Sequence, residues 1–329
     1  MDKTHLKKIA VLTSGGDAPG MNAAIRAVVR TCVYHGIVCI GVRRGYKGMV
    51  DGDFVEMHAR SVNNIINKGG TMLHSARCKE FMTKEGRKQA FENLSKESVN
   101  ALIVIGGDGS FKGALRFNAE FGISVMGIPG TIDNDIYGTT HTIGYDTALN
   151  TVVEAIDKIR DTAFSHDRLF FVEVMGRDAG YIALNAGVGA GAEEILVPEE
   201  NLGLDRLLES LKRSRNSGKM SSIVVVAEGD KTGKSVFELK EYVEQNMPDY
   251  DVRVSVLGHI QRGGTPSCFD RVLASRMGVR AVESLLESRG GYMVGILDDS
   301  MELTPLEKAI KGHSSINEDL LRVSDIITV

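Results

Sequence analysis

Six short apolar runs, rich in Ile and Val, recur along the chain and constrain its fold more than any other feature. Each run has about the length of a strand that is buried on both faces of a sheet. Most runs are followed by a glycine-containing turn and a helical pattern, as at residues 21–33 and 111–121. This repeated order predicts an α/β fold with a mostly parallel sheet. The expected strands are residues 9–12, 101–105, 124–128, 170–174, 223–227 and 293–297.

Composition and charge exclude several classes of protein. The net charge of −4 lacks the basic excess that is typical of a general nucleic-acid binder. No apolar run reaches the ~18 residues that a membrane helix requires, and the first residues lack the apolar stretch of a signal peptide. The four cysteines lack paired metal-ligand spacing and indicate reduced thiols. We therefore expect a cytoplasmic protein with neither a membrane nor a nucleic-acid partner.

Three loops follow expected strands, and ligands in open parallel sheets bind at the carboxyl ends of strands. The first loop, residues 14–22, joins a strand to a helix. Its glycines, such as Gly15, let backbone amides approach an anion, and the helix N-terminus adds positive potential. A tight turn that needs a positive φ explains this loop equally well.

The second loop, residues 106–110, places Asp108 among glycines. A carboxylate would repel a polyphosphate unless a divalent cation lies between them, and Mg²⁺ bound through one or two carboxylates and phosphate oxygens meets that need. The alternative role for Asp108 is a helix N-cap, but a cap does not require the flanking glycines. Lipid kinases and NAD kinases carry similar loops, so this loop indicates ATP phosphates without indicating the acceptor.

The third loop, residues 129–135, carries Asp133 and Asp135. In an extended loop these side chains would point to opposite sides, so that one could accept a proton from an attacking hydroxyl and the other could serve the metal region. A turn capped by Asp and Asn is the simpler alternative. Residues 229–235 look like a P-loop but have three residues between the glycines instead of four, which predicts a surface turn.

A bound phosphate ester favours fixed arginines that bind two of its oxygens. Several arginines lie beside apolar runs or glycines, although a lone arginine is usually a solvated charge or an ion-pair partner. Arg262 and His259, framed by glycines, are harder to explain in that way. The other candidates are Arg77, Arg168, Arg177 and Arg253.

Five segments in order, SGGDAPGMNAAIR, VIGGDGS, PGTIDND, VEVMGR and VLGHIQRGG, resemble the bacterial type of the ATP-dependent 6-phosphofructokinase family. The resemblance runs from the first strand to about Leu297. It implies two Rossmann-like three-layer domains with mostly parallel sheets, and phosphoryl transfer from ATP to fructose 6-phosphate in glycolysis. The ATP-binding domain would be residues 1–144 plus 261–309, and the sugar-phosphate-binding domain residues 145–260 plus 310–329.

The resemblance also implies the site residues. Asp133 would be the general base, with Thr131, Arg177, Gly15 and Arg77 as further catalytic residues, and Mg²⁺ would bind Asp108. The ATP contacts would be Gly15, Tyr46, Arg77, Cys78, Gly107, Asp108, Gly109 and Ser110. The sugar-phosphate contacts would be Thr131, Ile132, Asp133, Arg168, Met175, Gly176, Arg177, Glu228, Arg253, His259, Ile260, Gln261 and Arg262.

The same resemblance bears on assembly, donor and regulation. Arg168 and Arg253 would come from a neighbouring subunit of a homotetramer. Relatives that use pyrophosphate generally carry Asp at Gly109 and Lys at Gly130, so this chain should use ATP. An ADP or phosphoenolpyruvate effector site matches at Arg26, Arg30, Arg160, Gly191, Glu193 and Lys219, but it lacks three expected cations, at Ala59, Ser217 and Ser221. Arg60 lies one residue after Ala59 and is the candidate substitute for the first of these cations, and we expect altered or feeble allostery.

Two other functions compete with this one. A kinase with another acceptor, such as a lipid or NAD kinase, would share only the loop at residues 106–110. A catalytically silent subunit that senses nucleotides predicts damage at Asp133, Asp108 or Arg177, and all three are intact.

Overall fold

The chain folds into two compact units in the computed structural model, which describes residues 6–166, 168–200, 203–218, 221–312 and 315–327. Unit 1 comprises Met1–Ile132, Ile136–Thr147 and Arg262–Ser314. Unit 2 comprises Asp133–Asp135, Ala148–Gln261 and Ser315–Val329. Each unit therefore combines stretches that are distant in the sequence.

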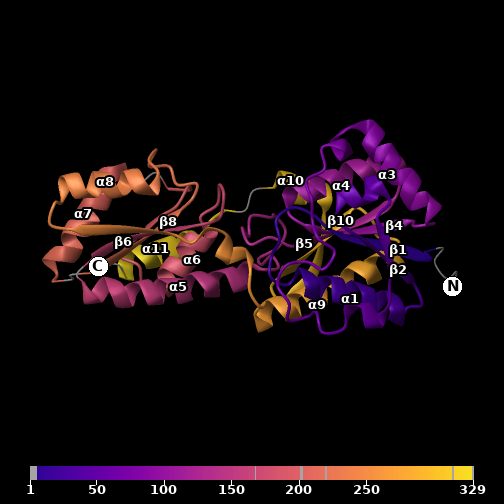
Figure 1. The fold of residues 1–329 in the computed structure, drawn as a ribbon, viewed down its shortest axis with the longest axis horizontal. Helices are drawn as coiled ribbons and strands as arrows, with labels where there is room; N and C mark the ends of the chain where they lie inside the picture. Colours follow the sequence, from indigo (N-terminus) through magenta and orange to yellow (C-terminus); the bar gives the residue numbers. More distant parts are fainter. Residues whose placement is uncertain (1–5, 167, 201–202, 219–220, 313–314, 328–329) are drawn as a thin grey trace. The chain divides into compact units, whose positions relative to one another are not determined.

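Unit 1 contains a seven-stranded sheet in the order β11-β10-β5-β4-β1-β2-β3 (Figure 1). The five inner strands pair in parallel, whereas β3 and β11 pair antiparallel at the two edges. The strands are β1 Lys8–Thr13, β2 Val38–Val42, β3 Phe54–Met57, β4 Ala101–Gly106, β5 Ser124–Pro129, β10 Tyr292–Leu297 and β11 Ser300–Pro305.

Helices cover both faces of this sheet (Figure 1). On one face, α1 (Met21–Tyr34) packs along α9 (Cys268–Leu286). On the other, Phe111 and Phe117 of α4 join strand residues in a buried apolar cluster. The remaining elements are α2 Tyr46–Asp51, η1 Ala59–Val62, η2 Glu80–Met82, α3 Lys84–Lys96, α4 Asp108–Phe121, η3 Gly258–Arg262 and α10 Leu306–Lys311.

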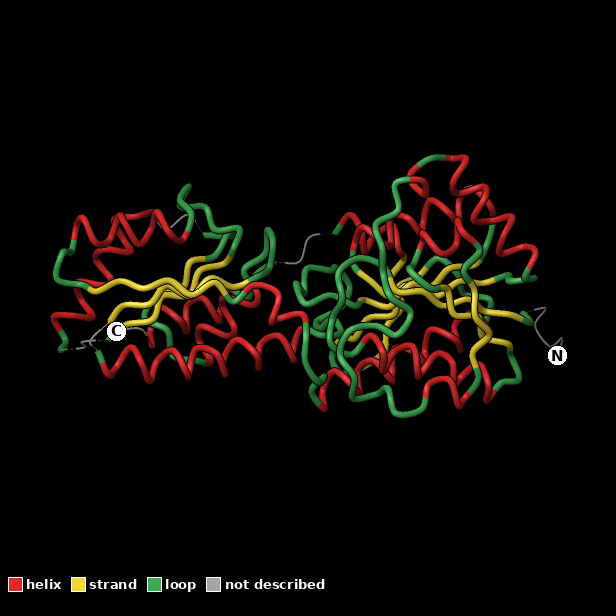
Figure 2. The backbone as a smooth tube through the Cα atoms, viewed as in Figure 1, coloured by secondary structure: helices red, strands yellow, loops and turns green. Residues whose placement is uncertain are grey.

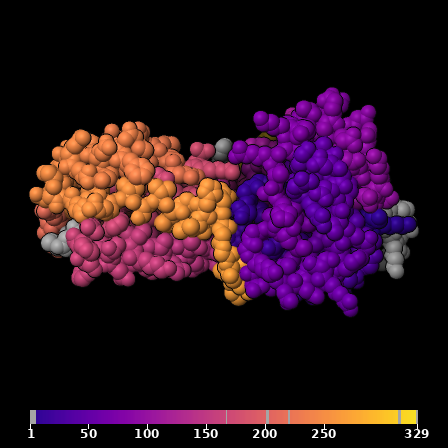
Figure 3. All heavy atoms as spheres, viewed as in Figure 1, coloured from indigo at the N-terminus to yellow at the C-terminus, as the bar shows by residue number. Residues whose placement is uncertain are grey.

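Unit 2 contains a four-stranded parallel sheet in the order β7-β8-β6-β9, formed by β6 Arg168–Val174, β7 Glu194–Leu196, β8 Ser222–Ala227 and β9 Asp251–Val256. Figure 2 shows the sheet of each unit as a yellow layer between red helices. Helices α7 and α8 share one apolar cluster with the strands. In the space-filling view, α5 in magenta and the region of α8 in orange form much of the visible surface of this unit (Figure 3). The helices are α5 Tyr145–Ser165, α6 Tyr181–Gly189, α7 Gly203–Asn216, α8 Val236–Asn246 and α11 Glu318–Ile327.

The predicted α/β fold with mostly parallel sheets is confirmed. All six expected strands and both expected helices lie within observed elements, namely β1, β4, β5, β6, β8, β10, α1 and α4. The turn expected at residues 229–235 is also present, and Ser235 at its end caps α8 together with Glu238. No helix in the described part of the chain combines the length and apolar character needed to cross a membrane.

Arg87 on α3 connects three elements of unit 1. Its Nε and Nη2 each lie 2.7 Å from a carboxylate oxygen of Glu120 on α4, and Nη1 donates to the carbonyls of Phe81 and Met82. Arg87 is only 5% exposed. Removing one partner of such a pair leaves the other charge and several acceptors poorly satisfied.

We therefore expect Arg87→Met to lower the free energy of unfolding by about 2–4 kcal/mol. Urea denaturation measures this change. Lys88→Met is the matched control, because Lys88 lies on the same helix and its side chain is 70% exposed. The control should change stability by less than about 0.5 kcal/mol. Equal effects of the two substitutions would contradict the structural role of Arg87.

Candidate active site

Three loops begin where the adjacent strands β1, β4 and β5 of unit 1 end. The Ser14 amide donates to the Ile105 carbonyl at 2.9 Å, and the Gly130 amide donates to the Gly106 carbonyl at 3.1 Å. A Cβ built on Gly107 would lie 3.8 Å from Cβ of Thr131. The sequence-predicted Gly15, Gly107 and Thr131 therefore lie on neighbouring loops at one edge of the sheet.

The loop at residues 106–110 needs glycine because its backbone lies close to the backbone of Ser14. A Cβ on Gly106 would collide with the Ser14 carbonyl oxygen, and Gly109 faces open space. Gly107 is the N-cap of α4 and Asp108 is the first helical residue, so the alternative of Asp108 as N-cap is wrong. An acid in the first turn still complements the helix dipole.

The two carboxylate oxygens of Asp108 have different environments. Oδ2 lies 2.6 Å from Nζ of Lys112, one turn along α4. Oδ1 is buried, and no hydrogen-bond partner for it occurs in the described part of the chain. A buried acceptor without a partner suits an ion or water. The described residues hold no cluster of three potential metal ligands, which is compatible with Mg²⁺ because this ion typically takes few protein carboxylates and completes its shell with water and phosphate oxygens.

Tyr46 lies beneath this loop. Its hydroxyl donates to the Ser110 carbonyl at 2.5 Å, and its ring stacks on Phe81 with centroids 4.1 Å apart. Burial raises the pKa of Tyr46, so the hydroxyl stays protonated and remains a donor. Tyr46 therefore supports the loop from the protein interior.

A further loop, residues 68–78, is fixed beside the first one. Asn22 Nδ2 donates to the carbonyls of Lys68 and Gly69 at 3.0 and 3.1 Å, and its Oδ1 accepts from the Met72 amide at 2.7 Å. Thr13 Oγ1 donates to the His74 carbonyl at 2.9 Å. The sequence assigned no role to Asn22 or Thr13, because their partners lie 46 to 61 residues away and no local pattern reveals them.

Arg77 and Cys78 end this loop. Arg77 is exposed, and the half-buried Cys78 thiol donates to Glu80 Oε2 at 3.4 Å. Burial raises the pKa of the Cys78 thiol. The thiol therefore stays in its neutral, protonated form.

The third loop carries Asp133, which is 2% exposed. The expectation of an extended loop is wrong at one residue, because Asn134 has a φ of 53°. Asn is among the few non-glycine residues that tolerate this left-handed conformation. The ends of the loop are tied, since Thr142 Oγ1 donates to the Thr131 carbonyl at 2.6 Å.

Arg177 contacts Asp133 within unit 2. Its Nε lies 3.4 Å from Asp133 Oδ2, and the side chain of Arg177 is 62% exposed. Arg177 has a φ of 54°, and the Glu228 Oε1 accepts from the amides of Arg177 and Gly176 at 2.7 and 3.3 Å. A Cβ on Gly229 would collide with the Arg177 carbonyl oxygen. Backbone strain is therefore held at the residue that contacts Asp133.

Acidic groups surround this part of unit 2. Burial raises the pKa of Glu173 on β6, and the carboxylates of Glu228 and Asp230 raise it further. An anionic substrate approaching these acids depends on nearby positive charge. Arg177 supplies such a charge at the end of β6.

The segment 258–262 divides between the units. Gln261 is fully buried; its Oε1 accepts from the Met175 amide at 3.2 Å and its Nε2 donates to the Gly258 carbonyl at 3.0 Å. Gln261 therefore braces the backbone at Met175. Its neighbours His259 and Ile260 are exposed. Arg262 belongs to unit 1, where its Nη1 lies 3.5 Å from the Asp17 carbonyl oxygen.

Arg168 and Arg253 lie away from this site. Arg168 begins β6, and both arginines bind Asp251, at 2.7 and 2.9 Å. The seven residues of β6 separate its two ends by about 20 Å. Within unit 2, Arg168 is therefore at the opposite end of the strand from Met175 and Arg177.

The expected effector residues lie in both units. Arg30 on α1 donates to Asn63, and burial lowers the pKa of Arg26. In unit 2, Arg160 donates to the carbonyls of Ala190 and Gly191 at 2.7 and 2.8 Å and lies 3.6 Å from Glu193. Lys219 lies outside the described residues.

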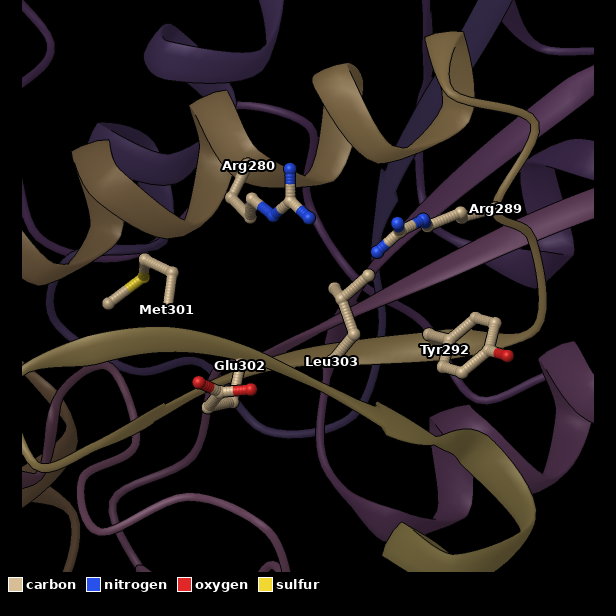
Figure 4. Close-up of a pocket in the computed structure, with 6 residues that line it drawn as sticks. All are labelled: Arg280, Arg289, Tyr292, Met301, Glu302 and Leu303. Carbon is tan, nitrogen blue, oxygen red and sulfur yellow. The ribbon is translucent and has the colours of Figure 1, made fainter.

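A cavity of about 310 Å³ opens between α9 and the β10–β11 hairpin (Figure 4). Glu287 engages both of its arginines, Arg280 at 3.1 Å and Arg289 at 3.5 Å. The cavity therefore offers little unneutralised positive charge, and it contains none of the sequence-predicted site residues. Its lining is Arg280, Arg289, Tyr292, Met301, Glu302 and Leu303.

A family model, curated relatives and a solved structure that match this chain are all phosphofructokinases. Residues 8–285 match the family described as Phosphofructokinase. ATP-dependent 6-phosphofructokinase 2 of Bacteroides thetaiotaomicron is 53% identical over 318 residues, covering 97% of each chain. ATP-dependent 6-phosphofructokinase 1 of Thermus thermophilus is 52% identical over 327 residues, covering 98% of this chain and 100% of the relative. The solved phosphofructokinase of Saccharomyces cerevisiae matches with a TM-score of 0.89 and 38% identity, over 98% of this chain and 46% of that chain.

Proposed function

Because this chain belongs to the phosphofructokinase family, we propose that it transfers the terminal phosphoryl group of ATP to the 1-hydroxyl of fructose 6-phosphate. The products are fructose 1,6-bisphosphate and ADP, the reaction is the committed step of glycolysis, and the enzyme works in the cytoplasm. The observation that carries the proposal is the buried Asp133 carboxylate, which lies four residues after the end of β5 and contacts Arg177 Nε at 3.4 Å.

Asp133 is the general base of this reaction. As the sugar 1-oxygen attacks the γ-phosphorus, its proton passes to the Asp133 carboxylate. The bond from the γ-phosphorus to the bridging oxygen breaks, and ADP takes that electron pair. The protein contributes mainly positioning and charge neutralisation. Thr131 and Arg177 position the sugar phosphate, and the Gly15 and Arg77 loops face the transferring group.

Asp108 is the residue that would hold Mg²⁺. The buried Oδ1 without a partner in the described chain supports this assignment, as does the neighbouring glycine loop. When bound, the ion would neutralise negative charge on the phosphates of ATP. Lys112 binds the other carboxylate oxygen and limits the negative charge of the site.

The active site is completed by a neighbouring subunit. Arg168 and Arg253 both form ion pairs with Asp251. Arg168 lies at the opposite end of β6 from Arg177, which supports the proposal that these two arginines bind substrate in the site of another subunit. We propose a homotetramer in which each sugar-phosphate site takes these two arginines from its neighbour. We expect regulation by ADP or phosphoenolpyruvate to be altered or feeble, because Ala59, Ser217 and Ser221 stand where the effector-site pattern has cations.

Two domains, whose bounds differ slightly from those of units 1 and 2, divide the substrates between them. Residues 1–144 plus 261–309 bind ATP, and residues 145–260 plus 310–329 bind the sugar phosphate. Tyr46, Cys78 and residues 107–110 belong to the first set, and Met175, Gly176, Glu228 and the exposed His259 to the second. This division is supported by the glycine loops of unit 1 and by the Arg177 loop of unit 2.

We expect ATP to be the phosphoryl donor and pyrophosphate to be a poor one. Gly109 faces open space, and a side chain there would occupy the region that the α-phosphate of ATP needs. A coupled assay with fructose 6-phosphate, comparing the two donors with and without Mg²⁺, measures this preference. Turnover with pyrophosphate that equals or exceeds turnover with ATP would contradict the donor assignment, and absence of turnover with both would contradict the proposed function.

A further inference from the structure

Asp270 on α9 is a fully buried carboxylate to which the proposed reaction assigns no role. Its Oδ1 accepts from the Gly144 amide at 2.8 Å. Its Oδ2 accepts from the Thr147 amide at 2.8 Å and from the Thr147 hydroxyl at 2.5 Å. Burial raises the pKa of Asp270, and the hydrogen bonds from Thr147 and Gly144 oppose that effect.

These bonds hold the first turn of α5, which begins at Tyr145. A carboxylate at a helix N-terminus satisfies amides that have no partner within the helix and complements the helix dipole. The Ser267 amide in turn donates to the Thr147 hydroxyl at 2.9 Å. The start of α9 therefore clamps the start of α5 through a network in which both oxygens of the acid are used.

The clamped residues also end the loop that carries Asp133. The Ile143 amide donates to the Pro129 carbonyl at 2.9 Å, and Ile143 pairs with Gly130 in a parallel bridge. The Thr142 hydroxyl donates to the Thr131 carbonyl at 2.6 Å. Because the loop closes on itself in this way, a displacement of its end at residue 144 is transmitted to its beginning, two residues before Asp133.

The backbone at Gly144, where this loop ends, is tightly packed and has little room to move. Its φ is 102°, and a Cβ there would lie 2.7 Å from Cβ of Ala18. The backbone amide that points at Asp270 is therefore held from one side by the first glycine loop and from the other by the acid. The backbone at Gly144 therefore has little room to adjust when the Asp270 side chain is replaced.

We infer that Asp270 is a positioning residue for phosphoryl transfer: its buried carboxylate fixes residues 144–147 and, through the closed loop, the position of Asp133. The inference rests on the proposed function, because it assigns Asp133 as the base. Small misplacements of catalytic groups lower rates by up to about 10²-fold, so the clamp affects turnover without touching the substrate.

We expect Asp270→Asn to lower kcat about 10- to 100-fold while the KM for ATP changes less than about threefold. The amide keeps the shape of the acid but points a donor at one of the two facing amides. Thr147→Val keeps shape, removes one hydroxyl and should lower kcat about 3- to 10-fold. Asp299→Asn is the matched control, because Asp299 is exposed and pairs with Arg276 of the same helix. It should leave kcat unchanged.

The decisive comparison uses Asp133→Asn as the background. If Asp270 acts through Asp133, adding Asp270→Asn or Thr147→Val to that background should cost less than about twofold in kcat. Equal fold losses in both backgrounds indicate a general structural role and overturn the inference, as does full kcat in Asp270→Asn. If Asp270→Asn does not fold, Thr147→Val decides, and unchanged kcat in that variant overturns the inference.

Hydrogen exchange separates this inference from the proposed function. Amides at residues 131–144 should exchange about tenfold or more faster in Thr147→Val than in the unaltered chain, while those of β4 should not change. This readout needs no substrate. A chain that fails to phosphorylate fructose 6-phosphate would refute the proposed function, whereas unchanged exchange at residues 131–144 would refute the clamp itself.

Discussion

The Asp133→Asn variant is expected to phosphorylate fructose 6-phosphate about 10²- to 10⁴-fold more slowly than the unaltered chain, with a modest change in KM. The substitution keeps the shape of the side chain but removes its ability to accept the proton of the attacking hydroxyl. Arg177 Nε, 3.4 Å away, can still contact the remaining oxygen, so substrate binding is largely preserved. Steady-state kinetics with saturating ATP and varied fructose 6-phosphate measure both parameters.

Asp135→Asn is the control for this experiment, because it makes the same chemical change two residues along the loop. Asp135 is more exposed than Asp133 and should cost less turnover. Thermal unfolding of both variants checks that the loop change has not destabilised the chain. Unchanged turnover in Asp133→Asn would refute the assignment of the general base, and a larger loss in Asp135→Asn would transfer that role to Asp135.

The second large effect is expected at Asp108. Asp108→Asn should raise the Mg²⁺ concentration needed for half-maximal activity about tenfold or more and lower kcat about 10²-fold. The reason is that an amide oxygen carries no full negative charge to attract a divalent cation. Titration of activity with Mg²⁺ at fixed ATP and fructose 6-phosphate measures this change.

Lys112→Met is a control that changes the charge of the site in the opposite direction from Asp108→Asn. Lys112 Nζ lies 2.6 Å from Asp108 Oδ2, so its removal frees a carboxylate oxygen and makes the site more negative. The Mg²⁺ requirement of this variant should stay the same or fall. If Asp108→Asn and Lys112→Met shift the requirement in the same direction, Asp108 is not the metal ligand.

Four of the five inner strands of unit 1 could be predicted because both of their faces are buried, whereas the inner strand β2 (Val38–Val42) was missed although it is apolar and buried. A strand such as residues 101–106 is then a continuous apolar run followed by a glycine loop. The short strand β3 and the partly exposed β9 lack that signal, and their existence depends on partners elsewhere in the chain. The sequence therefore predicted the layers and the loops at the strand ends, but not where each sheet stops.

The candidate site likewise contains residues that local sequence patterns indicate and residues that they do not. Asp108 and Asp133 could be proposed from the sequence because each lies in a local pattern of glycines and acids shortly after a buried strand. The supports of the site could not be found, because Asn22, Gln261 and Asp270 act on backbone groups 46 to 126 residues away. The left-handed φ of Arg177 also has no local signal, since arginine rarely adopts it and the carboxylate that holds it comes from another strand end.

The interleaving of the two units has a consequence for synthesis on the ribosome. Strands β10 and β11, together with the helix that packs along α1, all come from Arg262–Ser314, and the last helix of unit 2 comes later still. About 158 residues separate Thr147 from the end of β11 at Pro305, so at about 5–20 residues per second the nascent chain exposes an unfinished apolar face of unit 1 for roughly 8–30 seconds. Neither unit can therefore complete its packing until residues 262–327 have been made.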